Sequence, residues 1–145
     1  MQDFPHHYHV SAAAGPDDHV SISADNMPQL LSAPPAEFGG PGDQWSPEHL
    51  LAASVADCFV LTFRAIARAS RLEWTNLEAS AECVLDRVDR VTKFTAVTVR
   101  ATLTVPAGTD AEKARRLLHK AEDGCLVTSS MTADAHLEAD IIVAP

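Results

Sequence analysis

The chain has 145 residues, of which 46% are hydrophobic and 21% are charged. This size and composition predict one globular domain, residues 1–145, with a buried core. Eleven basic residues stand against 20 acidic ones, the net charge is −9, and no Lys or Arg precedes Arg64. Because this charge repels phosphate backbones and anionic lipids, we expect neither nucleic acid nor a membrane among the partners.

The first residues lack the basic and apolar regions of a secretory signal peptide. The most apolar stretch, Leu50–Phe63, is short for a membrane span and contains Asp57. We therefore expect a cytoplasmic protein. Its three cysteines are widely spaced and odd in number, so they form neither the paired framework of a secreted domain nor a Cys-x-x-Cys motif.

Residues 6–14 and 19–24 predict two short strands around a Gly-Pro-Asp-Asp turn. A loop rich in Pro and Gly, residues 34–43, follows them. Three histidines of the first predicted strand could bind a metal ion: His6, His7 and His9. No acidic or Cys ligand lies among them, so we expect no metal site.

A long helix is predicted to begin after Ser46, its N-cap, and to run to about Ser70 or Arg71. Pro47 suits the first helical position, and Glu48 suits the positive end of the helix. Such a helix spans about 37 Å. Its middle is almost entirely apolar or small, so we expect a sheet to cover one side and a second subunit to cover another.

Two alternating segments, residues 77–86 and 97–105, predict an antiparallel hairpin with one buried face. Thr109 begins a capping box for a second helix that ends near Asp123, where a glycine stops it. Residues 135–143 alternate as a last strand. This order of elements predicts an α+β fold.

Cys58 and Cys125 are the residues that could carry chemistry. Cys58 lies mid-helix, where the helix dipole gives no help, so a reactive thiolate there needs a cation from elsewhere. Cys125 begins a helical turn after a glycine, so its sulfur could point at free backbone amides, which lower a thiol pKa. The alternative interpretation for both cysteines is that each is a small buried hydrophobic residue without a chemical role. Cys83, on the apolar face of its strand, is interpreted as core.

Glu48 has two possible roles. The structural one is a favourable charge in the first turn of the helix, and the functional one is to orient a cation or share a proton near Cys58. Ten residues separate the two, about 15 Å along the helix axis. The side chains cannot meet within one straight helix. If they act together, one comes from a second subunit whose helix runs antiparallel, which again favours a dimer.

The stretch from Ser46 to Phe59, Ser-Pro-Glu-His-Leu-Leu-Ala-Ala-Ser-Val-Ala-Asp-Cys-Phe, resembles a motif of the OsmC/Ohr family (osmotically inducible protein C and organic hydroperoxide resistance protein). The family motif is Asn-Pro-Glu-x-Leu-(Leu/Phe)-x-Ala running into Ala-x-Cys-Phe. The run Cys-Leu-Val-Thr from Cys125 is similar to the family's Cys-Pro-x-Ser, and the Gly39-Gly40 loop and the order of elements also match. The resemblance implies antiparallel sheets wrapped around a long central helix, in an intertwined homodimer with two sites at its interface.

The resemblance also implies a thiol peroxidase of the oxidative stress response that uses no metal, haem or flavin. By position, Cys58 is the peroxidatic cysteine, Cys125 the resolving one, and Glu48 the carboxylate that holds an activating arginine. The peroxide oxidises the first cysteine to a sulfenic acid, and the second closes a disulfide, the reversible steps of cysteine oxidation. A dithiol then reduces the disulfide, and lipoyl groups serve this role in the Ohr branch.

Several residues depart from the family pattern. The family's arginine in the N-terminal region has no counterpart here, and the residues that could replace it are His9, His19, Arg64 and Arg68. Asp57, if ionised, would raise the pKa of the neighbouring Cys58, and Leu126 replaces the usual proline. The chain is therefore placed in a divergent branch. Apolar residues near the thiol favour an alkyl hydroperoxide: Phe59, Leu61, Phe63 and Met131.

We predict a cysteine-based reductase of organic hydroperoxides with weak activity. Two alternatives stay open. One is a small-molecule-binding protein on the same scaffold whose cysteines are inert. The other is a redox sensor in which a disulfide between Cys58 and Cys125 forms without turnover.

Overall fold

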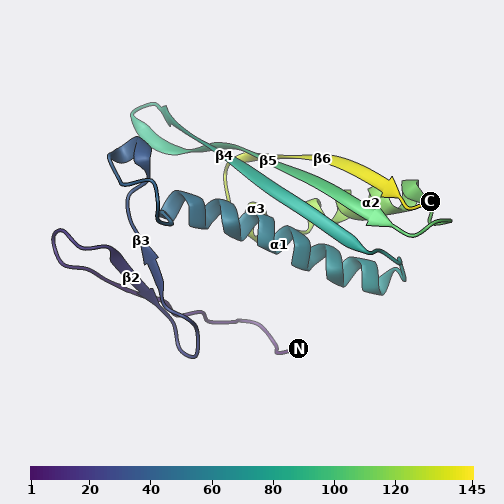
Figure 1. Cartoon of the computed structure of the whole chain (residues 1–145), viewed down its shortest axis with the longest axis horizontal. Coiled ribbons are helices and arrows are strands. Elements are labelled where there is room, and N and C mark those ends of the chain that lie inside the picture. Colours follow the sequence, from purple (N-terminus) through teal and green to yellow (C-terminus); the bar gives the residue numbers. More distant parts are fainter. The chain divides into compact units, whose positions relative to one another are not determined.

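A computed structural model describes residues 1–145 (Figure 1). The backbone divides into two compact units, Met1–Leu50 and Leu51–Pro145. The single domain predicted over residues 1–145 stays a prediction.

The first unit contains a small antiparallel sheet in the order β1-β2-β3, formed by Ser11–Ala13, Val20–Ser23 and Leu30–Ser32. The two predicted strands are present but are shorter than expected. The strand β3 was not predicted, because three residues before a Pro-rich loop are too few to show an alternating pattern. A 3-10 turn, η1 (Ala36–Phe38), follows. A side chain at Gly40 would lie 1.7 Å from the carbonyl oxygen of Pro34, so the loop requires glycine there.

The long helix α1 (Pro47–Ala69) begins where the sequence predicts. The Ser46 hydroxyl accepts a hydrogen bond from the backbone N–H of His49 at 3.1 Å, which confirms Ser46 as the N-cap. Every fourth residue on one face is buried: Val55, Phe59, Phe63 and Ala67. That spacing follows one helix face and marks the side packed into the core.

By length and composition alone, α1 could cross a membrane. The contrary expectation considered only Leu50–Phe63, whereas the whole helix is longer and 22% of its most apolar window is buried within this chain. The central helix of a globular fold meets the same criterion, and the buried stripe of α1 is that of a helix packed on a sheet.

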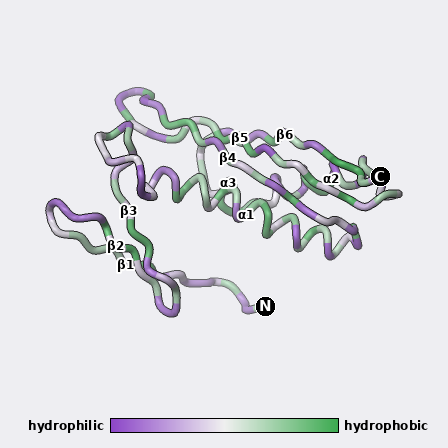
Figure 2. The backbone as a smooth tube through the Cα atoms, viewed as in Figure 1, coloured by the Kyte–Doolittle hydropathy of each residue, from purple (hydrophilic) through white to green (hydrophobic).

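The second unit contains a sheet in the order β4-β5-β6, formed by Asn76–Val88, Val91–Val105 and Asp134–Val143. The β4-β5 hairpin turns at Asp89 and Arg90, both with left-handed backbone (φ 51° and 69°) as tight hairpins require; Figure 2 shows this turn as polar. The predicted alternation is confirmed. However, β6 pairs parallel to β5, so this sheet is mixed rather than wholly antiparallel.

The helix α2 (Ala111–Asp123) buries Ala114, Leu118 and Ala121. Its N-cap is Asp110, one residue after the predicted Thr109, because the Asp110 carboxylate accepts hydrogen bonds from two backbone N–H groups of the first turn. A short helix, α3 (Leu126–Ser129), follows Cys125. Two sheets and a long central helix thus give the predicted α+β fold class.

Candidate functional site

Cys58 and Cys125 both belong to the second unit and lie near one another. Cys58 lies in the middle of α1 and is partly buried, whereas Cys125 is buried directly before α3. Both are free thiols. The Cys125 side chain lies close enough to the Cys58 sulfur to lower the pKa of that thiol. Residues distant in sequence therefore form a thiol pair.

Hydrogen-bond donors surround the sulfur of Cys58. Its Sγ lies 3.8 Å from the Thr62 hydroxyl, one turn further along α1. Burial raises the pKa of the Cys58 thiol, but hydrogen bonds from the Val127 backbone, the Cys125 side chain, the Thr62 hydroxyl and the Leu126 backbone together outweigh it. The pKa of Cys58 consequently lies below its ordinary value, because hydrogen bonds to the charged form favour that form.

The backbone amides of α3 serve a different cysteine from the one expected. The sequence suggested that they would face the sulfur of Cys125, yet that side chain makes no capping hydrogen bond. Instead, the amides of Val127 and Leu126 act on Cys58. The reason is tertiary: Gly124 lies against the Thr62 side chain of α1, which brings the backbone of Leu126 and Val127 near Cys58.

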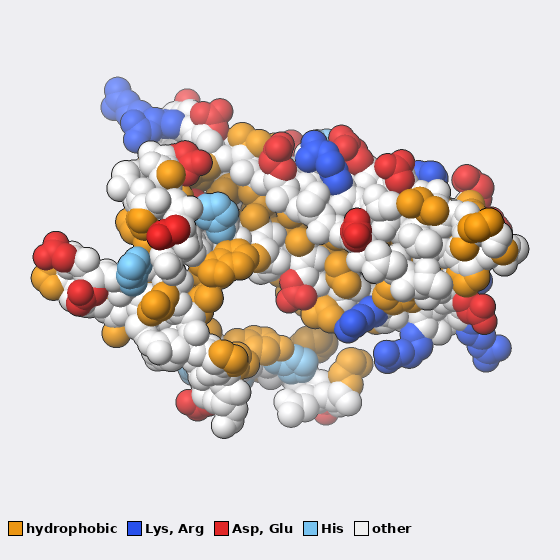
Figure 3. Space-filling model, viewed as in Figure 1, with side chains coloured by type: hydrophobic (Ala, Val, Ile, Leu, Met, Phe, Trp, Pro, Cys, Tyr) orange, Lys and Arg blue, Asp and Glu red, His pale blue; other side chains and the backbone are white.

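The structure shows no ion pair at Cys58. The cations suggested to replace the missing arginine include Arg64 and Arg68, which are exposed on the C-terminal half of α1, where basic side chains gather (Figure 3). The other two, His9 and His19, belong to the first unit. Asp57 is exposed, and the pKa of Cys58 is lowered rather than raised as its proximity suggested.

Glu48 lies in the first turn of α1, and its Oε2 is buried without a hydrogen-bond partner. It lines a hollow of about 310 Å³ in the first unit, whose walls are mostly apolar: Val20, Ala33, Pro34, Pro35, Phe38 and Pro47, with Ser32. A buried carboxylate oxygen without a partner is costly. The Glu48 carboxylate therefore has an unsatisfied hydrogen-bond acceptor in this chain.

Most of the residues expected to favour an alkyl substrate belong to the hydrophobic core. Phe59 and Phe63 are fully buried, and Phe63 packs edge-to-face on Trp74 at 5.4 Å. Met131 packs against the same core, and only Leu61 is exposed. The apolar pattern near Cys58 is thus largely that of the core, because the α1 face carrying Phe59 points to the sheet.

The remaining candidates lie apart from the thiol pair. Cys83 is half-buried on β4 with a pKa raised by burial, in agreement with a core position. His6 stacks on Phe4 and hydrogen-bonds to the backbone carbonyl of Gln2. No three potential metal ligands gather anywhere in residues 1–145.

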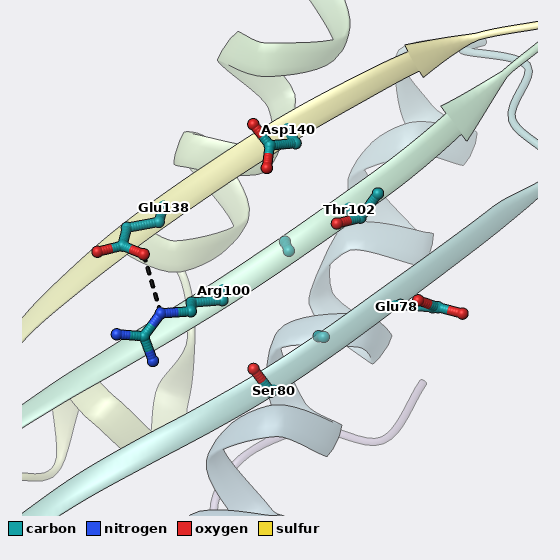
Figure 4. A pocket seen from close by; sticks show the side chains of 8 residues that line it. Glu78, Ser80, Arg100, Thr102, Glu138 and Asp140 are labelled. Carbon is teal, nitrogen blue, oxygen red and sulfur yellow. Dashed lines mark hydrogen bonds and ion pairs between the residues drawn. The ribbon is translucent and has the colours of Figure 1, made fainter.

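A polar hollow of about 370 Å³ lies on the sheet of the second unit. Figure 4 shows Arg100 of β5 paired with Glu138 of β6 at 2.9 Å, with Asp140 and Glu78 on the flanking strands. Both partners of the pair are largely exposed, and exposed ion pairs contribute little to stability. This surface carries no cysteine.

Sequence analysis did not single out Thr62. Its signal was available, because a residue four positions after Cys58 on a helix lies beside it. Helix spacing could not predict the contact of the α3 backbone amides with Cys58, because they lie in a different segment of the chain.

The fold and the site together define a class: α+β proteins with a long central helix and a pair of neighbouring thiols. The family profile described as OsmC-like protein matches residues 40–140. The chain belongs to the OsmC family, as the motif around Cys58 indicated.

Relatives in the same family span much of the chain. This chain is 24% identical over 143 residues to the uncharacterised protein YmaD of Bacillus subtilis (strain 168), and the aligned segment covers 95% of each chain. It is 28% identical over 93 residues to peroxiredoxin OsmC of Escherichia coli (strain K12), which covers 64% of each.

Solved structures share the fold. An OsmC-like protein of unknown function from Vibrio cholerae has a TM-score of 0.84 at 16% identity, over 93% of this chain and 99% of that one. An organic hydroperoxide resistance protein from Legionella pneumophila has a TM-score of 0.75 at 23% identity, over 97% and 99%. At these identities the likeness concerns the fold alone.

Proposed function

We propose that this protein is a thiol peroxidase that reduces organic hydroperoxides to alcohols. The observation that carries the proposal is that the pKa of Cys58 is lowered and that the Cys125 side chain is among the causes. A lowered pKa increases the fraction of thiolate, which is the nucleophilic form. The names of two relatives, a peroxiredoxin and an organic hydroperoxide resistance protein, support the same chemistry.

In the first step, the Cys58 thiolate attacks the terminal oxygen of a hydroperoxide ROOH. The sulfur–oxygen bond forms, the O–O bond breaks, and the leaving alkoxide takes a proton to become ROH. Cys58 is oxidised to a sulfenic acid. The donors that stabilise the thiolate, the Thr62 hydroxyl among them, lie where the sulfur reacts.

In the second step, the Cys125 thiolate attacks the sulfenic sulfur. The S–S bond forms and the hydroxyl leaves as water after taking a proton. A dithiol reductant, of which a lipoyl group is one example, then restores both thiols by exchange and leaves as its own disulfide. The effect of the Cys125 side chain on the pKa of Cys58 supports this step, because it requires the two side chains to lie near one another.

We further propose that the working form is a homodimer in which helix α1 packs on its symmetry mate. The exposed Leu61 on α1 supports this arrangement. Glu48, whose Oε2 lacks a partner within one chain, would then take a cation at the interface. The proposal assigns Glu48 to the site of the other subunit, since it cannot reach Cys58 along its own helix.

The test is to incubate the reduced protein with cumene hydroperoxide and a dithiol and to follow peroxide and thiol. We expect repeated turnover that is lost in Cys58→Ser, with Cys83→Ser as the matched control that keeps it. In Cys125→Ser, Cys58 should stop at the sulfenic acid. One stoichiometric disulfide without turnover would favour the redox sensor, and unreactive thiols would favour the small-molecule-binding protein.

A further inference from the structure

Thr62 contacts Cys58 in a way that its sequence position does not require. Its hydroxyl lies 3.8 Å from the Cys58 sulfur, within the range of a hydrogen bond to sulfur. A hydroxyl in a helix commonly bonds to a backbone carbonyl of the preceding turn. Ser54, one turn before Cys58, does so by donating to the carbonyl of Leu51 at 2.7 Å.

The methyl group of Thr62 explains this orientation. Its Cγ2 lies 3.6 Å from the position that a Cβ on Gly124 would occupy, so the methyl faces the backbone just before Cys125. A β-branched side chain has few χ1 rotamers in a helix. With the methyl held against Gly124, the hydroxyl is directed at the sulfur of Cys58.

No charged side chain accompanies these donors. The helix α3 contains no ionisable residue. Asp57 on α1 and Glu122 and Asp123 at the end of α2 are the nearest charged residues along these segments, and no charge is among the causes that shift the pKa of Cys58. The structure shows one ion pair, between Arg100 and Glu138, on the sheet. Within one chain, uncharged donors alone stabilise a negative sulfur at this position.

We propose that Thr62 is a positioning residue for Cys58, which holds the sulfur beside Cys125 and stabilises its thiolate by a neutral hydrogen bond. The inference rests on the proposed function, in which Cys58 is the nucleophile. It assigns to a hydroxyl on the same helix part of the task for which a mid-helix thiolate ordinarily needs a cation.

The experiment measures the rate of alkylation of Cys58 by iodoacetamide from pH 5 to 10, with the modified peptide identified by mass spectrometry. In Thr62→Val, which keeps the shape and removes the hydroxyl, we expect the rate at pH 7 to fall roughly five- to tenfold and the profile to move to higher pH. Ser54→Ala is the matched control, since it removes a hydroxyl bonded to the helix itself. It should leave the profile unchanged.

A second pair of variants tests the proposal even if the Thr62→Val protein folds poorly. Thr62→Ser and Thr62→Ala both lack the methyl group and differ only in the hydroxyl. Because Ser keeps the hydroxyl without the methyl that directs it, the proposal expects Ser to react more slowly than the wild type and Ala to react most slowly. An Ala or Val variant with the wild-type profile would overturn it.

Alkylation needs no peroxide, so this result is independent of the peroxidase proposal. If the Thr62 variants change the profile of a protein that consumes no hydroperoxide, the positioning role stands and the proposed function falls. If the wild type turns over peroxide while all Thr62 profiles coincide, the reverse holds.

Discussion

The Cys125 side chain lowers the pKa of Cys58 and therefore lies near its sulfur, although the two residues belong to different helical segments of the second unit. A disulfide needs a sulfur–sulfur distance of about 2.05 Å and a suitable approach of the two Cβ atoms. The proposed mechanism requires Cys58 and Cys125 to reach this geometry on oxidation.

Limited oxidation should join Cys58 to Cys125 and spare Cys83. Cys83 lies on β4 with a pKa raised by burial, which lowers its thiolate fraction. We expect peptide mapping under non-reducing conditions, after one equivalent of cumene hydroperoxide, to recover one disulfide. A disulfide that includes Cys83 would contradict the pairing.

The two partly buried cysteines should affect the pH dependence of stability in opposite directions. The folded pKa of Cys58 is lowered, so its contribution is present above the unfolded pKa, about 8.5, and is lost as the pH falls through the folded value. The folded pKa of Cys83 is raised by burial, so its contribution is present below the unfolded pKa and is lost as the pH rises through the folded value.

Urea unfolding of the reduced protein between pH 6.5 and 9.5 measures this difference. Relative to wild type, Cys58→Ser should lose stability increasingly as the pH rises. Cys83→Ser should show the opposite slope. If the stability of both variants follows the pH dependence of the wild type, neither thiol has a different pKa in the folded and unfolded chains.

Replacing Glu48 tests the dimer site. Breaking a buried charge pair typically costs about 3–5 kcal/mol, so Glu48→Gln should lower kcat/KM for cumene hydroperoxide at least tenfold if a partner's cation binds there. Glu37→Gln, an exposed acidic residue of the same unit, is the control. If Glu48→Gln stabilises the protein and keeps full turnover, the carboxylate has no such partner.

The exposed side of α1 should carry the self-association. Leu61 is 51% exposed on this helix, and so is Ile142 on β6. Sedimentation should show that Leu61→Glu dissociates the dimer, because it places a charge in an apolar contact, whereas Ile142→Glu does not. A wild-type protein that sediments as a monomer would refute the dimer itself.

The buried side of α1 should determine the stability of the second unit. Phe63 is fully buried against Trp74, and truncation of such a residue costs about 3–5 kcal/mol. We expect Phe63→Ala to lower the free energy of unfolding by that amount in chemical denaturation. Arg64→Ala, at the next and exposed position, should change it by less than about 0.5 kcal/mol.

Local patterns predicted most elements because their causes are local. The Ser46 cap and the alternation of β4 and β5 both follow from the local geometry of one backbone conformation. The cap of α2 was misplaced by one residue, since Thr109 and Asp110 are both good caps and the carboxylate makes the hydrogen bonds. The parallel pairing of β6 has no local signal at all.

The sequence by itself determined the element order, the fold class and the two cysteines worth testing, because periodicity, capping and motif are written along the chain. Only the tertiary structure decided that the amides after Cys125 serve Cys58, that Thr62 turns its hydroxyl to the same sulfur, and that Phe59 belongs to the core. These outcomes depend on how α3 packs against the middle of α1. A contact between segments far apart in the chain depends on the direction of every intervening element, and no local pattern records that direction.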